Sequence, residues 1–189
     1  MREIIVRNVS AGLLLLLSGC NPYVFVASQT YGAATDARSV GTQLSDDEIE
    51  ASIKAQLVAS PVPGTASIKA YSRQGVVVLT GVVPYGSSAG ITAVNIARTT
   101  QGVVRVETFF VDAQPSLTND LELEAKIKAA FVADPNLFAE RVSVVVYGGN
   151  AVLIGVVTDP THLEEFVNDA RSVNGVTSVR SYIQLINPT

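Results

Sequence analysis

The chain has 189 residues, of which 48% are hydrophobic, and a formal net charge of −4. This length allows one domain or two small ones, and the hydrophobic fraction excludes a generally disordered chain. The acidic balance, with no basic stripe along the sequence, excludes a nucleic-acid binder. The single cysteine, Cys20, excludes an intrachain disulfide, a zinc finger and a CxxC redox motif.

The N-terminus has the layout of a secretory signal peptide. Two arginines, Arg2 and Arg7, precede an apolar segment at residues 9–17, and the small pair Ser18-Gly19 follows it. The apolar segment is too short to span a bilayer, which takes about 20 residues. A short core helix is the alternative, but the small, polar stretch that follows offers it no amphipathic partner. We therefore assign residues 1–19 to a signal peptide.

The order Leu17-Ser18-Gly19-Cys20 behind that apolar segment resembles the lipobox of bacterial lipoproteins. The resemblance implies diacylation of the Cys20 sulfur, cleavage before Cys20 and acylation of the new amino terminus, and two or more acyl chains anchor a protein stably. Asn21 follows where an aspartate would, in enteric bacteria, favour the inner membrane. The implied location is the periplasmic face of the outer membrane, with residues 20–43 as a flexible tether.

The region after Gln43 contains two copies of one unit. The first copy reads DDEIEASIKAQL and later GVVVLTGVV, and the second reads DLELEAKIKAAF and later GNAVLIGVV. Ile53 matches Ile127 at an offset of 74 residues (127 − 53), and the glycines match at the same offset: Gly75 with Gly149 and Gly81 with Gly155. Such a repeat predicts two structural units of one kind. We place them at residues 44–112 and 117–187.

The first unit is predicted to begin with a helix. Ser45-Asp46 is an N-cap signal, and the apolar residues Ile49, Ile53 and Leu57 recur on one helical face. Beyond it, β-branched residues and glycine turns predict a hairpin, a second helix and a last strand. We place the strands at residues 67–72, 76–83 and 103–111, the turn at Gln74-Gly75 and the second helix at residues 87–100.

The second unit repeats this order. Thr118 and Asn119 are the capping candidates of its first helix, and Asp159-Pro160 opens its second helix as N-cap and N1, with Gly175 closing it. We place its strands at residues 142–147, 151–157 and 176–186, with the hairpin turn at residues 148–150. The predicted fold class is α+β, with two tandem αββαβ units. Each unit is a three-stranded mixed sheet with two helices covering one face.

Two glycine patterns recur in both units. The first pattern is VxLxGxV in the second strand, at residues 77–83 and 152–157. The second is a glycine before the last strand, in GVVRV at residues 102–106 and in GVTSV at residues 175–179. These patterns resemble the BON domain, a small bacterial envelope domain. With the lipobox, the chain resembles the dual-BON lipoproteins of the Gram-negative outer membrane. The resemblance implies binding of anionic phospholipid, a role in keeping the outer membrane intact and, in some members, an association with the division site.

Patterns that would carry catalysis are weak. His162, the only histidine, lies near the start of the last helix, where we expect it to be solvated. The carboxylates of residues 46–48 are interpreted as helix capping and macrodipole complementation, and Gly148-Gly149 as a turn because no Lys-Ser or Lys-Thr follows. We therefore expect a non-catalytic protein with no cofactor and no metal site. An uncharacterised hydrolase is the alternative.

A binding surface is predicted on the helix at residues 119–132. One face holds the core residues Leu123, Ile127 and Phe131, and almost opposite lies a second stripe, here called the outer stripe: Leu121, Ala125, Lys128 and Val132. An apolar stripe with a lysine suits contact with a membrane surface. Leu137 and Phe138 follow in the next loop and are predicted to extend it.

Two alternatives stay open for the outer stripe. It packs against the other domain, or it contacts another envelope protein, which would make the chain a periplasmic interaction scaffold. In the first unit an acid, Asp47, stands where the second unit has Leu121. Any contact with anionic phospholipid is therefore expected in the second unit.

Overall fold

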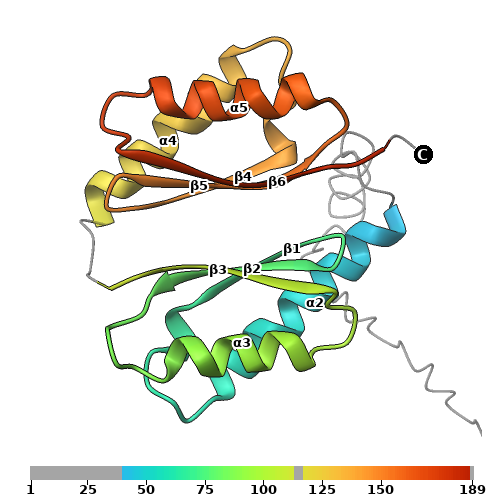
Figure 1. Ribbon diagram of the computed structural model, residues 1–189, viewed down its shortest axis with the longest axis vertical. Helices are drawn as coiled ribbons and strands as arrows, with labels where there is room; N and C mark the ends of the chain where they lie inside the picture. Colours follow the sequence, from blue (N-terminus) through green and yellow to red (C-terminus); the bar gives the residue numbers. More distant parts are fainter. Residues whose placement is uncertain (1–39, 113–116, 188–189) are drawn as a thin grey trace, which may run out of the picture.

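The computed structural model describes residues 40–112 and 117–187. The predicted signal peptide, Cys20 and residues 20–39 of the predicted tether lie outside the described residues. The described residues form two αββαβ units in tandem, which confirms the predicted fold class (Figure 1).

The first domain consists of two helices, a single 3-10 turn and three strands: α2 (Val40–Ala59), η1 (Thr65–Ser67), β1 (Lys69–Arg73), β2 (Val76–Val82), α3 (Ala89–Thr99) and β3 (Arg105–Val111). The strand order is β1-β2-β3. β1 pairs with β2 antiparallel, with Lys69 opposite Thr80, and β3 pairs with β2 parallel. The sheet is therefore mixed, as predicted.

The second domain repeats this arrangement with the elements α4 (Leu117–Ala133), η2 (Ala139–Arg141), β4 (Val142–Tyr147), β5 (Asn150–Val157), α5 (Pro160–Ser172) and β6 (Ser178–Leu185). Its strand order is β4-β5-β6, with β4 antiparallel and β6 parallel to β5. α5 starts as predicted, because the Asp159 side chain accepts the backbone N–H of Thr161 at 2.8 Å and Pro160 is the first helical residue.

Each domain has its own core between its helices and one face of its sheet. In the first domain Ile49, Ile53 and Leu57 of α2 are buried, as the helical spacing predicted. In the second, Phe131 of α4 meets Phe166 of α5 edge to face, with ring centroids 4.8 Å apart. The helices thus cover the outer face of each sheet.

A third core lies between the two sheets. Val78 of β2 packs with Val152 and Ile154 of β5, and four aromatic residues surround them: Tyr71, Phe109, Tyr147 and Tyr182. The faces that carry no helices therefore meet, and the layers run helices, sheet, sheet, helices (Figure 1). This arrangement explains why β2 and β5 are almost continuously apolar, since strands covered on both faces lack the usual alternation.

The start of the first helix differs from the prediction. α2 begins at Val40, so residues 40–43, expected in the tether, are helical, and Ser45-Asp46 lies within the helix instead of capping it. Residues 40–44 contain no proline and one glycine, so the helix can continue upstream of Ser45.

Candidate functional site

Asp46 and Asp120 occupy equivalent positions in the two domains and hold the hairpin turns. The Asp46 carboxylate accepts hydrogen bonds from Ser72 Oγ at 2.7 Å, from the backbone N–H of Gln74 at 2.7 Å and from that of Gly75 at 3.0 Å. Asp120 accepts the backbone N–H groups of Gly148 and Gly149. Both carboxylates are buried. The interpretation of Asp46 as a helix cap is therefore wrong, because its oxygens are engaged with β1 and the turn.

The outer stripe lies on the exposed side of α4. Leu121 is 62% exposed and Val132 is 74% exposed, which is high for apolar side chains of their size, and Ala125 and Lys128 are also exposed. Lys128 Nζ pairs with Glu124 Oε1 at 2.6 Å along the helix. Four of the predicted membrane-contacting residues are therefore displayed together. The alternative that this stripe is covered by the first domain is not what the structure shows.

The loop after α4 divides the two remaining predicted residues. Leu137 is only 8% exposed and belongs to the core of the second domain, so it cannot extend the surface as predicted. Phe138 is 49% exposed, and the Arg141 guanidinium lies 4.3 Å from the centre of its ring. The prediction for Leu137 is wrong because the 3-10 turn that follows brings this side chain back beneath α4.

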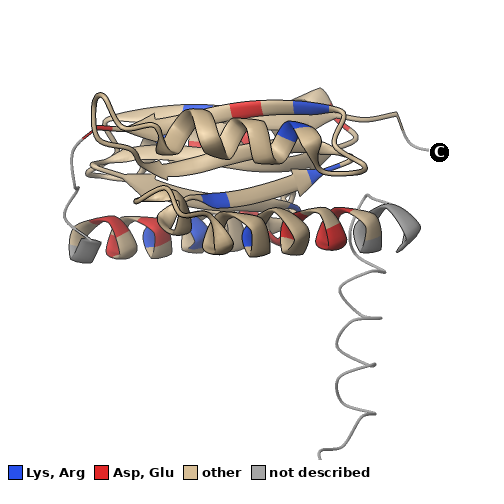
Figure 2. Ribbon diagram, turned by 90° about the horizontal axis from the view of Figure 1, so that it is seen from below, with Lys and Arg blue, Asp and Glu red and all other residues tan. Residues whose placement is uncertain are grey.

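The charges of the two first helices differ. α2 carries four carboxylates and one lysine, whereas α4 carries three carboxylates and two lysines. Both lysines of α4 pair with carboxylates four residues earlier, Lys126 with Glu122 and Lys128 with Glu124. Figure 2 shows the two helices overlapping along one edge of the view, and in each helix the acidic residues precede the lysines. The acidic excess is smaller on α4 than on α2, and this favours α4 as the helix that approaches an anionic surface.

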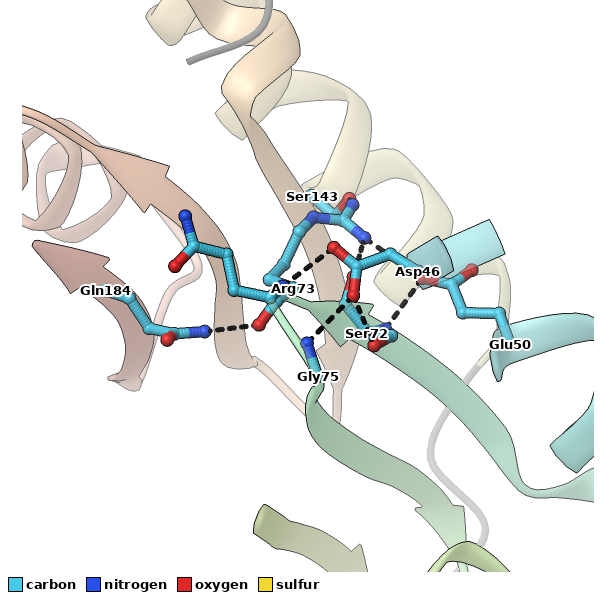
Figure 3. A network of polar contacts seen from close by, with 8 residues as sticks. Asp46, Glu50, Ser72, Arg73, Gly75, Ser143 and Gln184 are labelled. Carbon is cyan, nitrogen blue, oxygen red and sulfur yellow. Dashed lines mark hydrogen bonds and ion pairs between the residues drawn. The ribbon is translucent and has the colours of Figure 1, made fainter. Parts of the chain in front are cut away.

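Arg73 connects the two domains. Its guanidinium donates to Glu50 Oε1 at 2.9 Å within the first domain and to Ser143 Oγ at 3.0 Å in the second. The Arg73 carbonyl accepts from Gln184 Nε2 at 2.9 Å. Figure 3 shows Arg73 and Gln184 reaching each other from the two sheets. Burial raises the pKa of Glu50, in spite of the hydrogen bond from Ser72 N–H and the charge of Arg73.

Tyrosine hydroxyls make the other polar contacts between the sheets. Tyr147 OH lies 3.1 Å from Thr80 Oγ1, and Tyr182 OH donates to the carbonyl of Thr108 at 2.8 Å. Burial raises the pKa of Tyr71 to about 12 and also raises that of Tyr147. Tyr71 and Tyr147 are therefore neutral at physiological pH. A set of direct hydrogen bonds around an apolar centre holds the domains in one orientation.

The residues considered for catalysis do not converge. His162 is half-buried at the start of α5. Asp46 is bonded to Ser72 and to the hairpin turn at Gln74 and Gly75, an arrangement here called the hairpin clamp, which Asp120 repeats at the turn of the second domain. Among residues 40–112 and 117–187, no group of three or more His, Cys, Asp and Glu side chains is placed to hold a metal ion. In the same part of the chain, no helix combines the length and the apolar character needed to cross a membrane.

Sequence reasoning missed the polar contacts between the domains. It also missed the contacts of Asp46 and Asp120 within each domain, although a pattern marked them: the pair Asp46 and Glu50 recurs as Asp120 and Glu124 with the same spacing. A buried acid that recurs in both copies indicates a shared structural bond. No comparable pattern marks Arg73, because the second copy has Tyr147 in its place.

Comparison with known proteins follows the same division into two units. The family model of the BON domain matches residues 45–111 and again residues 119–187. The outer membrane lipoprotein DolP of Haemophilus influenzae is 27% identical to this chain over 174 residues, which is 89% of each chain.

Two solved structures show weaker similarity. CdsD, a structural protein of the type III secretion system of Chlamydia trachomatis, is 18% identical with a TM-score of 0.32, over 75% of this chain and 64% of that one. The C-terminal domain of CdsD is 16% identical with a TM-score of 0.31, over 75% of this chain and 67% of that one. The chain spans less than two thirds of the first of these structures.

Proposed function

Because this chain belongs to the BON domain family, we propose that it is a non-catalytic outer-membrane lipoprotein whose BON domains bind anionic phospholipid and help to maintain envelope integrity. The similarity to an outer membrane lipoprotein supports the envelope location. The lipobox-like residues 17–20 support an anchor at Cys20 that places the domains on the periplasmic side.

The observation that carries the proposal is the exposure of the outer stripe. Leu121 and Val132 present apolar side chains on the same side of α4 as Lys128. Burying one such side chain in the acyl boundary of a membrane is worth roughly 1.5–3 kcal/mol at most. The pair of Lys128 with Glu124 is a surface ion pair worth about 0–1 kcal/mol, so a lipid phosphate can replace the carboxylate.

An acylated N-terminus would raise the local concentration of the domains at the membrane. A tether of residues 20–39 that is flexible has a mean reach of roughly 25 Å, from about 5–6 Å times the square root of its length. A site held this close to lipid needs only weak intrinsic affinity. Two apolar side chains and one lysine are then sufficient.

Vesicle co-sedimentation of the soluble form that lacks residues 1–20 tests the proposal. We expect binding to vesicles that contain phosphatidylglycerol, little binding to pure phosphatidylcholine, and a loss of about tenfold or more in Leu121→Glu with Val132→Glu. Val58→Glu, at the equivalent place on α2, is the matched control and should bind normally. Equal and negligible binding to both kinds of vesicle, at lipid concentrations up to the roughly millimolar range that a short tether supplies, would refute lipid binding.

The alternative is a periplasmic scaffold whose outer stripe contacts another envelope protein. It makes a different prediction for photo-crosslinking from positions 121 and 132 in cells. Lipid contact gives adducts that run close to the uncrosslinked chain on a gel, because a lipid adds little mass, whereas protein contact gives a discrete larger adduct at both positions.

A further inference from the structure

A groove with a volume of about 410 Å³ lies between the two domains, beside the start of β1 and the end of β4. Its walls are mainly apolar, from Val82, Pro84, Leu121, Val145 and Val146. Four charged side chains line it as well: Lys69, Asp112, Asp120 and Glu124. A groove of this size with a few polar groups is large enough to take a ligand or a side chain.

The other end of the same interface is the internal counterpart of this groove. With the 74-residue offset, Arg73 stands where the groove has Tyr147, and Glu50 stands where it has Glu124. At that end the Arg73 side chain lies between the domains, only 14% exposed, with its guanidinium bonded to Glu50 and to Ser143 (Figure 3). One end of the interface is thus filled by an aliphatic stem that carries a guanidinium.

Three differences between the copies leave the groove open. Gly64 and Ser67 stand where the second domain has the large residues Phe138 and Arg141. Tyr147, in the place of Arg73, is engaged in the sheet interface, where its hydroxyl lies 3.1 Å from Thr80 Oγ1 and its ring stacks with that of Phe109. The carboxylate of Glu124 therefore lines the groove with no equivalent of Arg73 to meet it.

We propose that this groove is a docking site for a segment of a partner protein that carries an arginine flanked by apolar residues. The aliphatic stem would lie against the apolar walls, which include Val82 and Val145, and the guanidinium would bond to Glu124, as that of Arg73 does to Glu50 at the other end. Three carboxylates and one lysine line the groove, so its charge favours a cation and disfavours an anionic headgroup.

The state of each carboxylate identifies Glu124 as the contact. Asp120 is buried and accepts the backbone N–H groups of Gly148 and Gly149, and Asp112 accepts that of Tyr85. The Glu124 side chain is 22% exposed and pairs with Lys128, which does not line the groove. An incoming guanidinium can take the place of Lys128 in this surface ion pair. This docking site shares Leu121 and the Glu124–Lys128 ion pair with the outer stripe, but its ligand is a cation that contacts Glu124, whereas lipid contacts Lys128.

The test uses the full chain in nanodiscs, with labelled valine and leucine methyl groups observed by NMR. The probe is n-butylguanidinium, which reproduces an arginine side chain, and 1-pentanol and pentanoate are the neutral and anionic probes of the same length. We expect n-butylguanidinium to shift the methyl signals of Val82, Val145 and Val146 and to bind at least about threefold more tightly than 1-pentanol. Pentanoate should leave these signals unchanged.

Three variants of α4 assign the effect to one carboxylate. Glu124→Gln should weaken n-butylguanidinium binding about three- to tenfold, and Lys128→Gln, which removes the competing ammonium, should strengthen it. Glu122→Gln breaks the matching pair with Lys126 outside the groove, so binding should not change.

Three results would overturn the proposal. The first is that n-butylguanidinium shifts none of the groove signals. The second is that 1-pentanol or pentanoate binds as tightly as n-butylguanidinium. The third is that Glu122→Gln and Glu124→Gln weaken binding equally. The second of these would indicate an apolar or acyl-chain site, and the third a general effect of charge. None of them bears on vesicle binding, so the lipid proposal stands or falls separately.

Discussion

The Arg73 guanidinium of the first domain donates a hydrogen bond to Ser143 Oγ of the second domain at 3.0 Å while pairing with Glu50 of its own domain at 2.9 Å. A cation shared in this way joins α2, β1 and β4. The orientation of the two BON domains therefore depends on a residue that only one of them carries at this position.

Arg73→Met keeps the aliphatic stem and removes the donors. We expect the free energy of unfolding at pH 7 to fall by about 2–3 kcal/mol, because Glu50 and Ser143 lose their partner in a half-buried site. Urea denaturation measures this. Arg105→Met is the control, because its pair with Glu107 is exposed and surface pairs are worth about 0–1 kcal/mol. Equal losses in the two variants would contradict a special role for Arg73.

The pH dependence of stability should show the environment of Glu50. Burial raises its pKa in the folded state above 4.5, so the folded protein holds this proton more tightly than the unfolded chain. The contribution of Glu50 to the free energy of unfolding is then complete below its pKa in the unfolded chain, and it is lost as the pH rises through its pKa in the folded protein. The unfolding free energy of the wild type minus that of Glu50→Gln should therefore be largest near about pH 4 and decrease toward about pH 7.

Glu122→Gln should give the opposite slope. The hydrogen bond from Lys126 and its charge lower the pKa of Glu122, so its contribution is present above the unfolded pKa and is lost as the pH falls through the folded pKa. Urea titrations of both variants at several pH values provide the comparison. Parallel curves for the two variants would show that the assigned environments are wrong.

Removal of the Asp46 clamp should destabilise the first domain. Asp46→Ala leaves the buried hydroxyl of Ser72 and the buried N–H of Gly75 without their acceptor, and we expect a loss of about 2–4 kcal/mol. Asp47→Ala changes an exposed neighbour on the same helix and should stay within about 0.5 kcal/mol of the wild type. Similar losses for both would favour a general charge effect near the helix start.

Gly155 is required because the backbone of the neighbouring strand approaches it closely. A Cβ there would collide with the carbonyl oxygen of Arg141 and lie 2.9 Å from Val142 Cγ2. Gly155→Ala should therefore cost about 2–3 kcal/mol, in the upper part of the range for overpacked core sites, because the collision is with backbone. Gly86→Ala has open space around its Cβ and strains only a positive φ, so it should cost about 1 kcal/mol. A larger loss at Gly86, measured by thermal unfolding, would contradict this account.

The fold could be predicted because its signals are local. The glycine turns at Gly75 and Gly149 and the cap at Asp159 act within a few residues, and the repeat shows each signal twice. The core face of each first helix followed from apolar spacing alone, as Ile53 and Ile127 show.

Contacts between distant residues could not be predicted in the same way. Asp46 has the residue type and neighbours of a helix cap, yet its carboxylate bonds to a turn 28 residues later along the chain. Leu137 looked like a loop residue because the turn that buries it leaves no periodic pattern. The packing of the two sheets was indicated only by the lack of alternation in β2 and β5.

The central claim, that α4 contacts lipid through its outer stripe, is tested most directly by paramagnetic relaxation. The full chain in phosphatidylglycerol nanodiscs with gadolinium-labelled headgroups would be compared with the same chain in unlabelled nanodiscs. We predict strong broadening of the amide signals of residues 121–132, with little broadening at the equivalent residues 47–58 of α2. Broadening of α2 without α4, or of neither helix, would contradict the claim.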